Sequence, residues 1–210
     1  MEGALCGRAG GDVRLIETLL WDGARFPRLP LHLARLAAGA GAFGFACDPA
    51  AVRGALMAAV GAQAARVRLT LGAAGDPEVT VAPLPAAKAD WRLGLATARL
   101  SSADPWLRVK STRRAAYDAA RAALPAGLDE VVFLNERGEV CDGTITTVFF
   151  DRGQGMRTPP LSCGLLPGVL RAELAVPEEV LLAQDLPRVR LWVGNALRGL
   201  ISAVWAGSEI

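Results

Sequence analysis

The sequence predicts an α+β protein of two lobes. Alternating apolar residues favour strands in several segments, and apolar residues at helical spacing favour helices between them. A segment with two prolines and little pattern, residues 82–90, separates the two sets of elements. We therefore expect an N-terminal lobe over residues 1–82, a linker over 83–90 and a C-terminal lobe over 91–210.

The N-terminal lobe is expected to contain a strand, two helices and a hairpin. Residues 13–20 favour the strand, and the turn Trp21–Ala24 is of a hairpin type, with Arg25 and Phe26 starting the return. Pro30 suits the first turn of a helix, where a missing N–H costs little, and this helix ends before Gly44. The remaining elements are a helix over 49–64 capped by Asp48 and Pro49, and a hairpin of strands 67–71 and 79–81.

The C-terminal lobe is expected to be richer in strands. A helix over 111–123 carries alanines that predict a small-residue packing face, namely Ala115, Ala119, Ala122 and Ala123. The best-defined hairpin joins 131–134 to 140–150 through the turn at Asn135–Gly138. The other expected elements are a strand over 92–98, a short helix over 168–175, and strands over 191–193 and 201–205.

Charge and hydropathy limit the partners that we expect. The net charge is only +2, and the 21 Arg and 2 Lys residues are scattered among acids, so we expect no nucleic-acid partner. The longest uncharged stretch, residues 158–170, has 13 residues, which is too short to cross a bilayer. The first residues show no secretory signal, so we expect a cytoplasmic protein without a membrane partner.

Several kinds of catalytic site are excluded by the residue inventory. The four cysteines form no C-x-x-C pair and only one histidine is present, so we expect no metal site. The sequence has no G-x-S-x-G motif and no phosphate-binding G-x-x-x-x-G-K-[ST] loop. Enzymatic chemistry would therefore have to come from a cofactor, a lysine or carboxylates.

Five short features occur together in a recognisable order. They are Glu17-Thr18, the helix start LHLARL with His32 and Arg35, Lys110 in VKSTRRAAYDAAR, GEVCDGTITTVFF at 138–150, and LLPGVLR at 165–171 followed by GNALRG at 194–199. Their order and spacing resemble the class IV, or fold-type IV, family of pyridoxal-phosphate enzymes. This family contains branched-chain and D-amino-acid aminotransferases and 4-amino-4-deoxychorismate lyase. The resemblance extends from about Leu15 to Trp205.

The resemblance implies a fold, a cofactor and an assembly. The fold would be like that of D-amino-acid aminotransferase, with a small α/β N-terminal lobe and a larger β-barrel-like C-terminal lobe. The cofactor would be pyridoxal 5′-phosphate, the substrate a small amino compound, and the assembly a homodimer. Lys110, in the C-terminal lobe, matches the Schiff-base lysine, because a primary amine can condense with an aldehyde. His32 would have a packing or hydrogen-bonding role.

The same resemblance assigns the other cofactor contacts. Asp142 stands where the family usually has a glutamate facing the pyridine nitrogen, and its side chain is shorter by one C–C bond, about 1.5 Å. Arg35 matches the arginine that binds the phosphate. Val169 and Leu170 would offer main-chain N–H groups at a helix start, and Asn195 matches a phosphate contact in the last turn.

The reaction is open between three alternatives. The segment Lys110–Arg114 and the turn 194–199 resemble those of the lyase, and Thr18 matches its threonine thought to assist proton transfer. Such an enzyme would release pyruvate and 4-aminobenzoate for folate synthesis. An aminotransferase acting on branched-chain or D-amino acids is the second alternative. A non-catalytic relative is the third, because the aspartate at position 142 and the short N-terminus depart from the family pattern.

Overall fold

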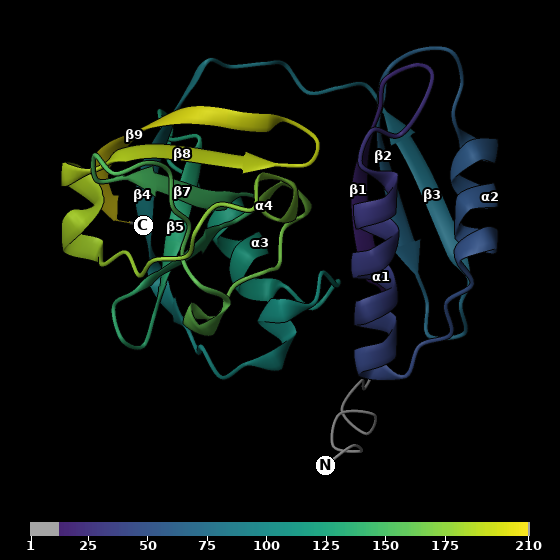
Figure 1. The fold of residues 1–210 in the computed structure, drawn as a ribbon, viewed down its shortest axis with the longest axis horizontal. Coiled ribbons are helices and arrows are strands. Elements are labelled where there is room, and N and C mark those ends of the chain that lie inside the picture. Colours follow the sequence, from purple (N-terminus) through teal and green to yellow (C-terminus); the bar gives the residue numbers. More distant parts are fainter. Residues whose placement is uncertain (1–12, 210) are drawn as a thin grey trace. The chain divides into compact units, whose positions relative to one another are not determined.

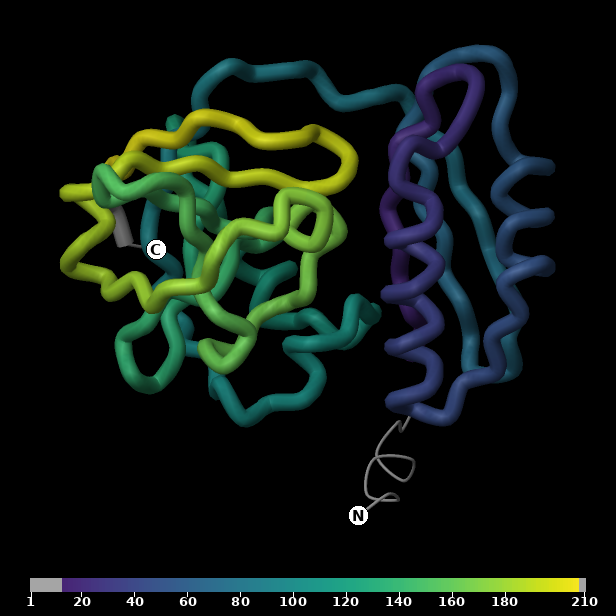
Figure 2. Tube along the Cα trace, viewed as in Figure 1, coloured from purple at the N-terminus to yellow at the C-terminus, as the bar shows by residue number. Residues whose placement is uncertain are grey.

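The computed structural model describes residues 13–209, which divide into two compact units. The first comprises the chain up to Ala86 together with Val109–Arg113, and the second comprises Ala87–Arg108 and the chain from Arg114. Figures 1 and 2 show the path of the chain. The α+β architecture with two sheets is confirmed. The structure groups Lys110 with the first unit, whereas the sequence division placed it beyond the linker.

An antiparallel three-stranded sheet forms the centre of the first unit. Its strands are β1 (Leu15–Trp21), β2 (Ala65–Leu71) and β3 (Pro77–Ala82), in the order β1-β2-β3. Leu15 pairs with Leu71, and Leu69 pairs with Val79, so one face of the sheet collects apolar side chains. Helices α1 (Leu29–Phe43) and α2 (Pro49–Ala59) lie beside the sheet (Figure 1).

The predicted caps of α1 and α2 are confirmed, but two details of this region differ. The side chain of Asp48 accepts a hydrogen bond from Ala50 N at 2.8 Å, and α1 ends at the left-handed Gly44. Helix α2 ends at Ala59, five residues earlier than expected. The hairpin return through Arg25 and Phe26 is wrong, because β1 pairs with β2 and the side chain of Asp22 closes a turn that leads into α1.

The segment Val109–Arg113 extends the first sheet beyond β1. Leu15 and Ser111 form an antiparallel bridge, and Ile16 N donates to Lys110 O at 2.7 Å. Thr112 N donates to Arg14 O at 2.9 Å. The helix expected from residue 111 therefore begins later, as α3 (Ala115–Ala122), because the preceding backbone groups are committed to β1.

A six-stranded mixed sheet forms the second unit. Strand β4 (Asp90–Leu100) is parallel to β5 (Glu130–Asn135) and β9 (Gly199–Glu209), and the other neighbours in the sheet are antiparallel. The two strands at the ends of the order, β6 and β7, are consecutive in the chain, and Gly143 N donates to Thr146 O at 2.8 Å across the bend between them. The sheet therefore nearly closes into a barrel, as expected. In the order β6-β5-β4-β9-β8-β7, the strands are Val140–Gly143, Glu130–Asn135, Asp90–Leu100, Gly199–Glu209, Arg190–Asn195 and Thr147–Asp151.

The expected hairpin over 131–150 is correct only in its first part. Strand β6 pairs with β5, but β7 leaves this pair and joins β8. Helix α4 (Val169–Leu174) starts where a helix was expected. Short 3₁₀ helices complete the unit at Pro105–Arg108, Leu161–Cys163 and Ala183–Arg188.

Strand β5 separates the two apolar clusters of the second unit. Val132 and Leu134 belong to one cluster, with β7, β8 and β9, while Val131 and Phe133 belong to the other. A fully buried apolar side chain of this size stabilises the fold by about 1.5–3 kcal/mol. Against the second cluster pack Tyr117 and Ala120 of α3. The predicted packing face of this helix is therefore wrong, and its members are exposed: Ala115, Ala119, Ala122 and Ala123.

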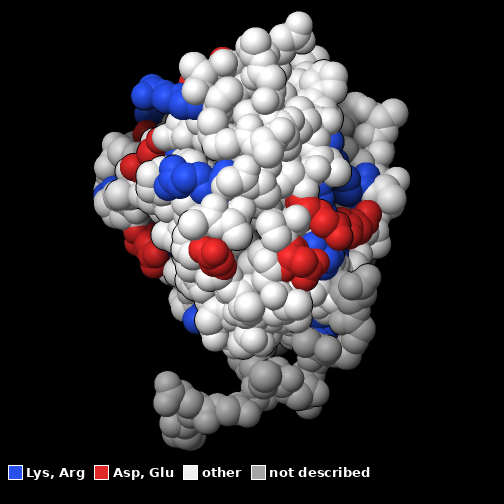
Figure 3. Space-filling model, turned by 90° about the vertical axis from the view of Figure 1, so that its right-hand side faces the viewer, with Lys and Arg blue, Asp and Glu red and all other residues white. Residues whose placement is uncertain are grey.

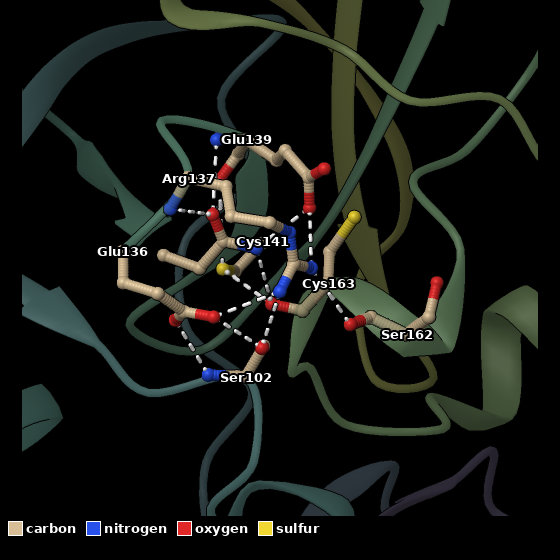
Figure 4. Close-up of polar contacts among 8 residues, drawn as sticks. Ser102, Glu136, Arg137, Glu139, Cys141, Ser162 and Cys163 are labelled. Carbon is tan, nitrogen blue, oxygen red and sulfur yellow. Dashed lines mark hydrogen bonds and ion pairs between the residues drawn. The ribbon is translucent and has the colours of Figure 1, made fainter.

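The turn between β5 and β6 is held by charged side chains (Figure 4). Arg137 donates to Glu136 at 2.8 Å, to Glu139 at 2.6 Å and to the hydroxyl of Ser102 at 2.7 Å. Ser102 in turn donates to Glu136 at 2.5 Å. The cluster thus ties the turn to the segment that follows β4.

The molecular surface carries charges of both signs. On the face drawn in Figure 3, basic and acidic residues form small neighbouring groups with neutral surface between them. Among the described residues, no helix is long and apolar enough to cross a membrane. The same residues contain no group of three or more His, Cys, Asp or Glu side chains arranged to hold a metal ion.

Candidate functional site

Thr18 and Lys110 share one face of the first sheet. Lys110 is the neighbour of Ser111, which bridges to Leu15, so Lys110 lies opposite Ile16 on the paired segment. Directly opposed residues of an antiparallel pair project to the same side, and side chains two residues apart along a strand do so too. The register therefore puts Lys110, Ile16 and Thr18 on one face. Glu17 projects to the other face, toward α1.

A buried network joins Glu17 to two residues of α1. Arg35 donates to both carboxylate oxygens of Glu17, from Nε at 2.8 Å and from Nη2 at 2.6 Å. Nδ1 of His32 lies 2.6 Å from the same carboxylate. Glu17 and His32 are each only 3% exposed at the side chain, and Arg35 is 13% exposed. His32 therefore has the hydrogen-bonding role expected for it.

This network holds Glu17 in its charged form. Burial alone would raise the pKa of the Glu17 carboxyl group, but the charge of Arg35 and the hydrogen bonds from His32 and Arg35 outweigh it and lower the pKa below its usual value. The two-pronged contact also fixes the guanidinium plane of Arg35. A guanidinium has five N–H donors, so Arg35 has the capacity to contact a phosphate in addition to Glu17.

In the second unit, the carboxylate of Asp142 is held at both oxygens. The hydroxyl of Tyr117 on α3 donates to Oδ1 at 3.0 Å, and the main-chain N–H of Leu166 donates to Oδ2 at 3.2 Å. Asp142 lies on β6 and is only 6% exposed. A carboxylate can accept about four hydrogen bonds, so this one can receive a ring N–H as well as these two.

The bend that follows Asp142 is organised by Glu130. This residue begins β5 and is fully buried. Its carboxylate accepts hydrogen bonds from the main chain and hydroxyl of Thr144, from Ile145 N at 3.1 Å and from the hydroxyl of Thr146 at 2.9 Å. Nη1 of Arg121 lies 3.6 Å from Oε1 of the same carboxylate. One carboxylate thus fixes the bend at 144–146.

The start of α4 and the turn between β8 and β9 lie against the same bend. A Cβ atom on Gly168, which precedes α4, would be 2.6 Å from the hydroxyl of Thr147, and one on Gly194 would be 2.6 Å from Leu170. A Cβ atom on Gly194 would also be 2.5 Å from the main-chain oxygen of Gly199, so this position requires glycine, whereas at Gly168 the Thr147 side chain would have to move. Asn195 donates from Nδ2 to Ile145 O at 3.2 Å, and its Oδ1 accepts from Leu197 N and Arg198 N, which closes the turn.

The predicted site residues therefore form two groups. In the first unit, Thr18 and Lys110 share a face and Arg35 lies on the other side of β1. The second group surrounds the 144–147 region of the second unit: Asp142, Val169, Leu170 and Asn195. The role of each remains a prediction.

Three residues in these groups were not predicted as site residues. Glu17 stood in a motif beside Thr18, but no sequence signal pointed to its pairing with Arg35. Glu130 begins an apolar strand, where an acidic residue suggests an exposed end. Tyr117 could have been found, because it and Ala120 lie three positions apart on the helix face that packs on Phe133.

Comparison with known proteins gives consistent matches. The family model of class IV amino-transferases matches residues 14–204. A candidate aminodeoxychorismate lyase of Schizosaccharomyces pombe is 35% identical over 170 residues, which cover 78% of this chain and 73% of that protein.

Two solved structures are informative neighbours. A candidate amino-acid aminotransferase from Mesorhizobium loti has a TM-score of 0.89 and 45% identity, covering 93% of this chain and 100% of that one. A hypothetical aminotransferase from Mycobacterium tuberculosis, in its α-ketoglutarate- and PMP-bound form, has a TM-score of 0.80 and 23% identity, covering 97% of this chain and 84% of that one.

Proposed function

The chain belongs to the class IV aminotransferase family, and we propose that it is a pyridoxal-phosphate-dependent lyase that converts 4-amino-4-deoxychorismate into 4-aminobenzoate and pyruvate. The family and the relatives indicate an enzyme of lyase or aminotransferase type. One observation carries the choice of the lyase. The pairing of β1 with Val109–Arg113 puts the Thr18 hydroxyl on the same face as the Lys110 amine.

The donor set fits pyridoxal phosphate, on which this family depends. Lys110 supplies a primary amine, the group that condenses with an aldehyde. Asp142 supplies a buried carboxylate, held at both oxygens, that suits a protonated ring nitrogen. Arg35, fixed by Glu17, and the start of α4 supply donors for a phosphate.

When bound, pyridoxal phosphate supplies an electron sink for the bond that breaks next to the substrate amine. Lys110 would hold the aldehyde carbon through its primary amine, and the same amine could accept and return a proton. Asp142 would face the ring nitrogen and favour its protonated form, and Arg35 would bind the phosphate. Arg35 and Asp142 are already oriented by hydrogen bonds to their neighbours.

The lyase reaction requires one proton to be removed from the substrate ring and one proton to be added to the departing group. The ring carbon bearing the amine loses its proton, the neighbouring C–O bond breaks with its electrons going to oxygen, and the ring becomes aromatic. The departing enolpyruvate gains a proton at its methylene carbon and becomes pyruvate, so the atoms balance. Lys110 can remove the first proton, and Thr18, on the same face, can relay the second.

An aminotransferase acting on branched-chain or D-amino acids is the second candidate. The observation that favours it is the 45% identity to the candidate amino-acid aminotransferase, which exceeds the 35% to the candidate lyase. An aminotransferase must bind two substrates in succession and return its cofactor to the starting form. It has no enolpyruvate to protonate, so its rate has no need of the Thr18 hydroxyl.

Purified protein with added pyridoxal phosphate distinguishes these candidates. We expect a visible absorption band that borohydride fixes to the protein and that Lys110→Ala lacks. Aminodeoxychorismate should then yield 4-aminobenzoate, measured by its fluorescence, and Thr18→Val should lower that rate at least tenfold without changing the absorption band. Conversion of D-alanine or a branched-chain amino acid, with Thr18→Val as active as the wild type, would instead support the aminotransferase.

The active form is proposed to be a homodimer, following the family. Light scattering coupled to size exclusion measures this directly. A mass of twice the 22.0 kDa chain is the expected result, and a monomer active at the same concentration would contradict it.

A further inference from the structure

Tyr117 and Asp142 connect α3 to β6 by a direct hydrogen bond. The distance from the tyrosine hydroxyl to Oδ1 is 3.0 Å. The other oxygen of this carboxylate receives the main-chain N–H of Leu166, from the loop before α4. Two donors from two separate elements therefore determine the orientation of one buried carboxylate.

The ring of Tyr117 is itself held firmly. It packs edge-on against Phe133 of β5 with the ring centroids 4.9 Å apart, and the guanidinium of Arg114 lies 5.6 Å from the ring centroid. Burial, followed by the charge of Asp142, raises the pKa of the Tyr117 hydroxyl well above its usual value. The hydroxyl therefore remains protonated and continues to donate at any pH at which the enzyme works.

We propose that Tyr117 is a positioning residue that holds the Asp142 carboxylate, ionised and correctly oriented, for the ring nitrogen of bound pyridoxal phosphate. The inference rests on the proposed cofactor, and its physical basis is the short side chain at position 142. Aspartate has fewer rotamers and a shorter reach than glutamate, so it is less able to adjust its position toward the ring nitrogen. The orientation of its oxygens therefore depends on a fixed donor. Because the Tyr117 hydroxyl and the Leu166 N–H are both donors, Asp142 acts toward them as an acceptor, which is the role that a protonated ring nitrogen would need from it.

The experiment compares three full-length proteins loaded with pyridoxal phosphate that carries ¹⁵N in its ring. They are the wild type, Tyr117→Phe and the control Ala120→Gly. The Phe variant keeps the ring contact with Phe133 and removes only the hydroxyl. The control loosens the same face of α3 without touching the hydroxyl–carboxylate pair.

Tyr117→Phe should shift the ring ¹⁵N signal toward that of unprotonated pyridine and weaken cofactor binding about tenfold, as expected for loss of a charge-assisted hydrogen bond. Ala120→Gly should leave the ¹⁵N signal at its wild-type position. An unchanged signal in Tyr117→Phe, or an equal shift in the control, would overturn the inference alone. A wild-type protein that binds no pyridoxal phosphate would overturn the proposed function and this inference with it.

A second measurement uses the fact that Tyr117 is the one tyrosine of the chain. Protein grown with 3-fluorotyrosine carries the label at this position alone, with a more acidic hydroxyl that is a stronger donor. The ring ¹⁵N signal should then move in the direction opposite to that caused by Tyr117→Phe. A shift in the same direction for both would indicate a packing effect and contradict the positioning role.

Discussion

Arg35 on α1 and Glu17 on β1 form a two-pronged ion pair, with Nε to Oε1 at 2.8 Å and Nη2 to Oε2 at 2.6 Å. Arg35, which we propose binds the phosphate, is thus oriented before the cofactor binds, because a buried carboxylate fixes its guanidinium plane. His32, the single histidine, adds a second contact to that carboxylate.

Glu17→Gln should therefore reduce both stability and cofactor affinity. Breaking one side of a buried ion pair costs about 3 kcal/mol of unfolding free energy, measured by urea denaturation. Pyridoxal phosphate affinity should fall about tenfold, because Arg35 loses its fixed orientation. The matched control is Glu78→Gln, which removes a carboxylate that is 68% exposed. A Glu17→Gln protein with wild-type affinity would show that Arg35 needs no such support.

The same pair predicts a pH dependence of stability. The pKa of Glu17 is lowered in the folded protein, so the pair stabilises the fold above the ordinary pKa of glutamate, about 4.5. That stabilisation is lost as pH falls below this value and the carboxylate takes up a proton. The unfolding free energy of Glu17→Gln should consequently change less between pH 6 and pH 3 than that of the wild type.

The turn between β5 and β6 makes a separate acid-sensitive contribution (Figure 4). Hydrogen bonds from Ser102 lower the pKa of Glu136 to about 2, and those from Arg137 and Asn135 lower the pKa of Glu139 to about 2. The stability from these groups is complete above pH 4.5 and is lost as pH falls toward 2. Glu139→Gln should flatten the fall in thermal midpoint over this window. A curve parallel to that of the wild type would contradict the prediction.

The sequence predicted the positions of the strands and helices better than the pairing between the strands. Alternation in residues 67–71 and 79–81 identifies a hairpin, because the two strands are neighbours in the chain and in the sheet. Strand β7 has the same kind of pattern, but its partner β8 lies about 40 residues further along. Local pattern contains no information on such a choice. The pairing of Val109–Arg113 with β1 was missed for the same reason, because the two segments lie far apart in the sequence.

The same contrast holds in the candidate site between the predicted residues and the residues that orient them. Lys110, Arg35 and Asp142 were singled out by the resemblance of their surrounding motifs to the class IV family, and their roles remain predictions. The partners that orient them, Glu17 and Tyr117, lie on other elements, and only the packing of those elements brings them within hydrogen-bonding distance.

The end of α4 offers a test of backbone strain. Ala175 adopts φ 48° and ψ 35°, a left-handed conformation that an L-residue with a Cβ atom enters at a cost of about 1–2 kcal/mol. Ala175→Gly should raise the unfolding free energy by about 1 kcal/mol, after the greater flexibility of the unfolded chain is taken into account. Ala123→Gly, at the end of α3 with φ −88°, is the matched control and should lower it. Equal effects of the two substitutions would contradict the strain at Ala175.

Glu130 supports the bend next to Asp142 and should be sensitive to loss of one carboxylate oxygen. In Glu130→Gln, the amide nitrogen would face either the donors of Thr144 or those of Ile145 and Thr146, so at least one buried group would lose its acceptor. An unsatisfied buried polar group costs about 1–3 kcal/mol, and urea denaturation should show a loss of that size. The N–H of Ile145 donates to Glu130, so its amide hydrogen exchange should become faster by the factor that corresponds to this free energy.

The control for Glu130 is Thr146→Val, which removes one donor and leaves the carboxylate with its other partners. It should cost only about 1 kcal/mol and leave exchange at Ile145 near the wild-type rate. If Glu130→Gln and Thr146→Val accelerate that exchange equally, the bend is held by general packing and not by the carboxylate. If only Glu130→Gln does so, the fixed geometry of the segment after Asp142 depends on one buried charge.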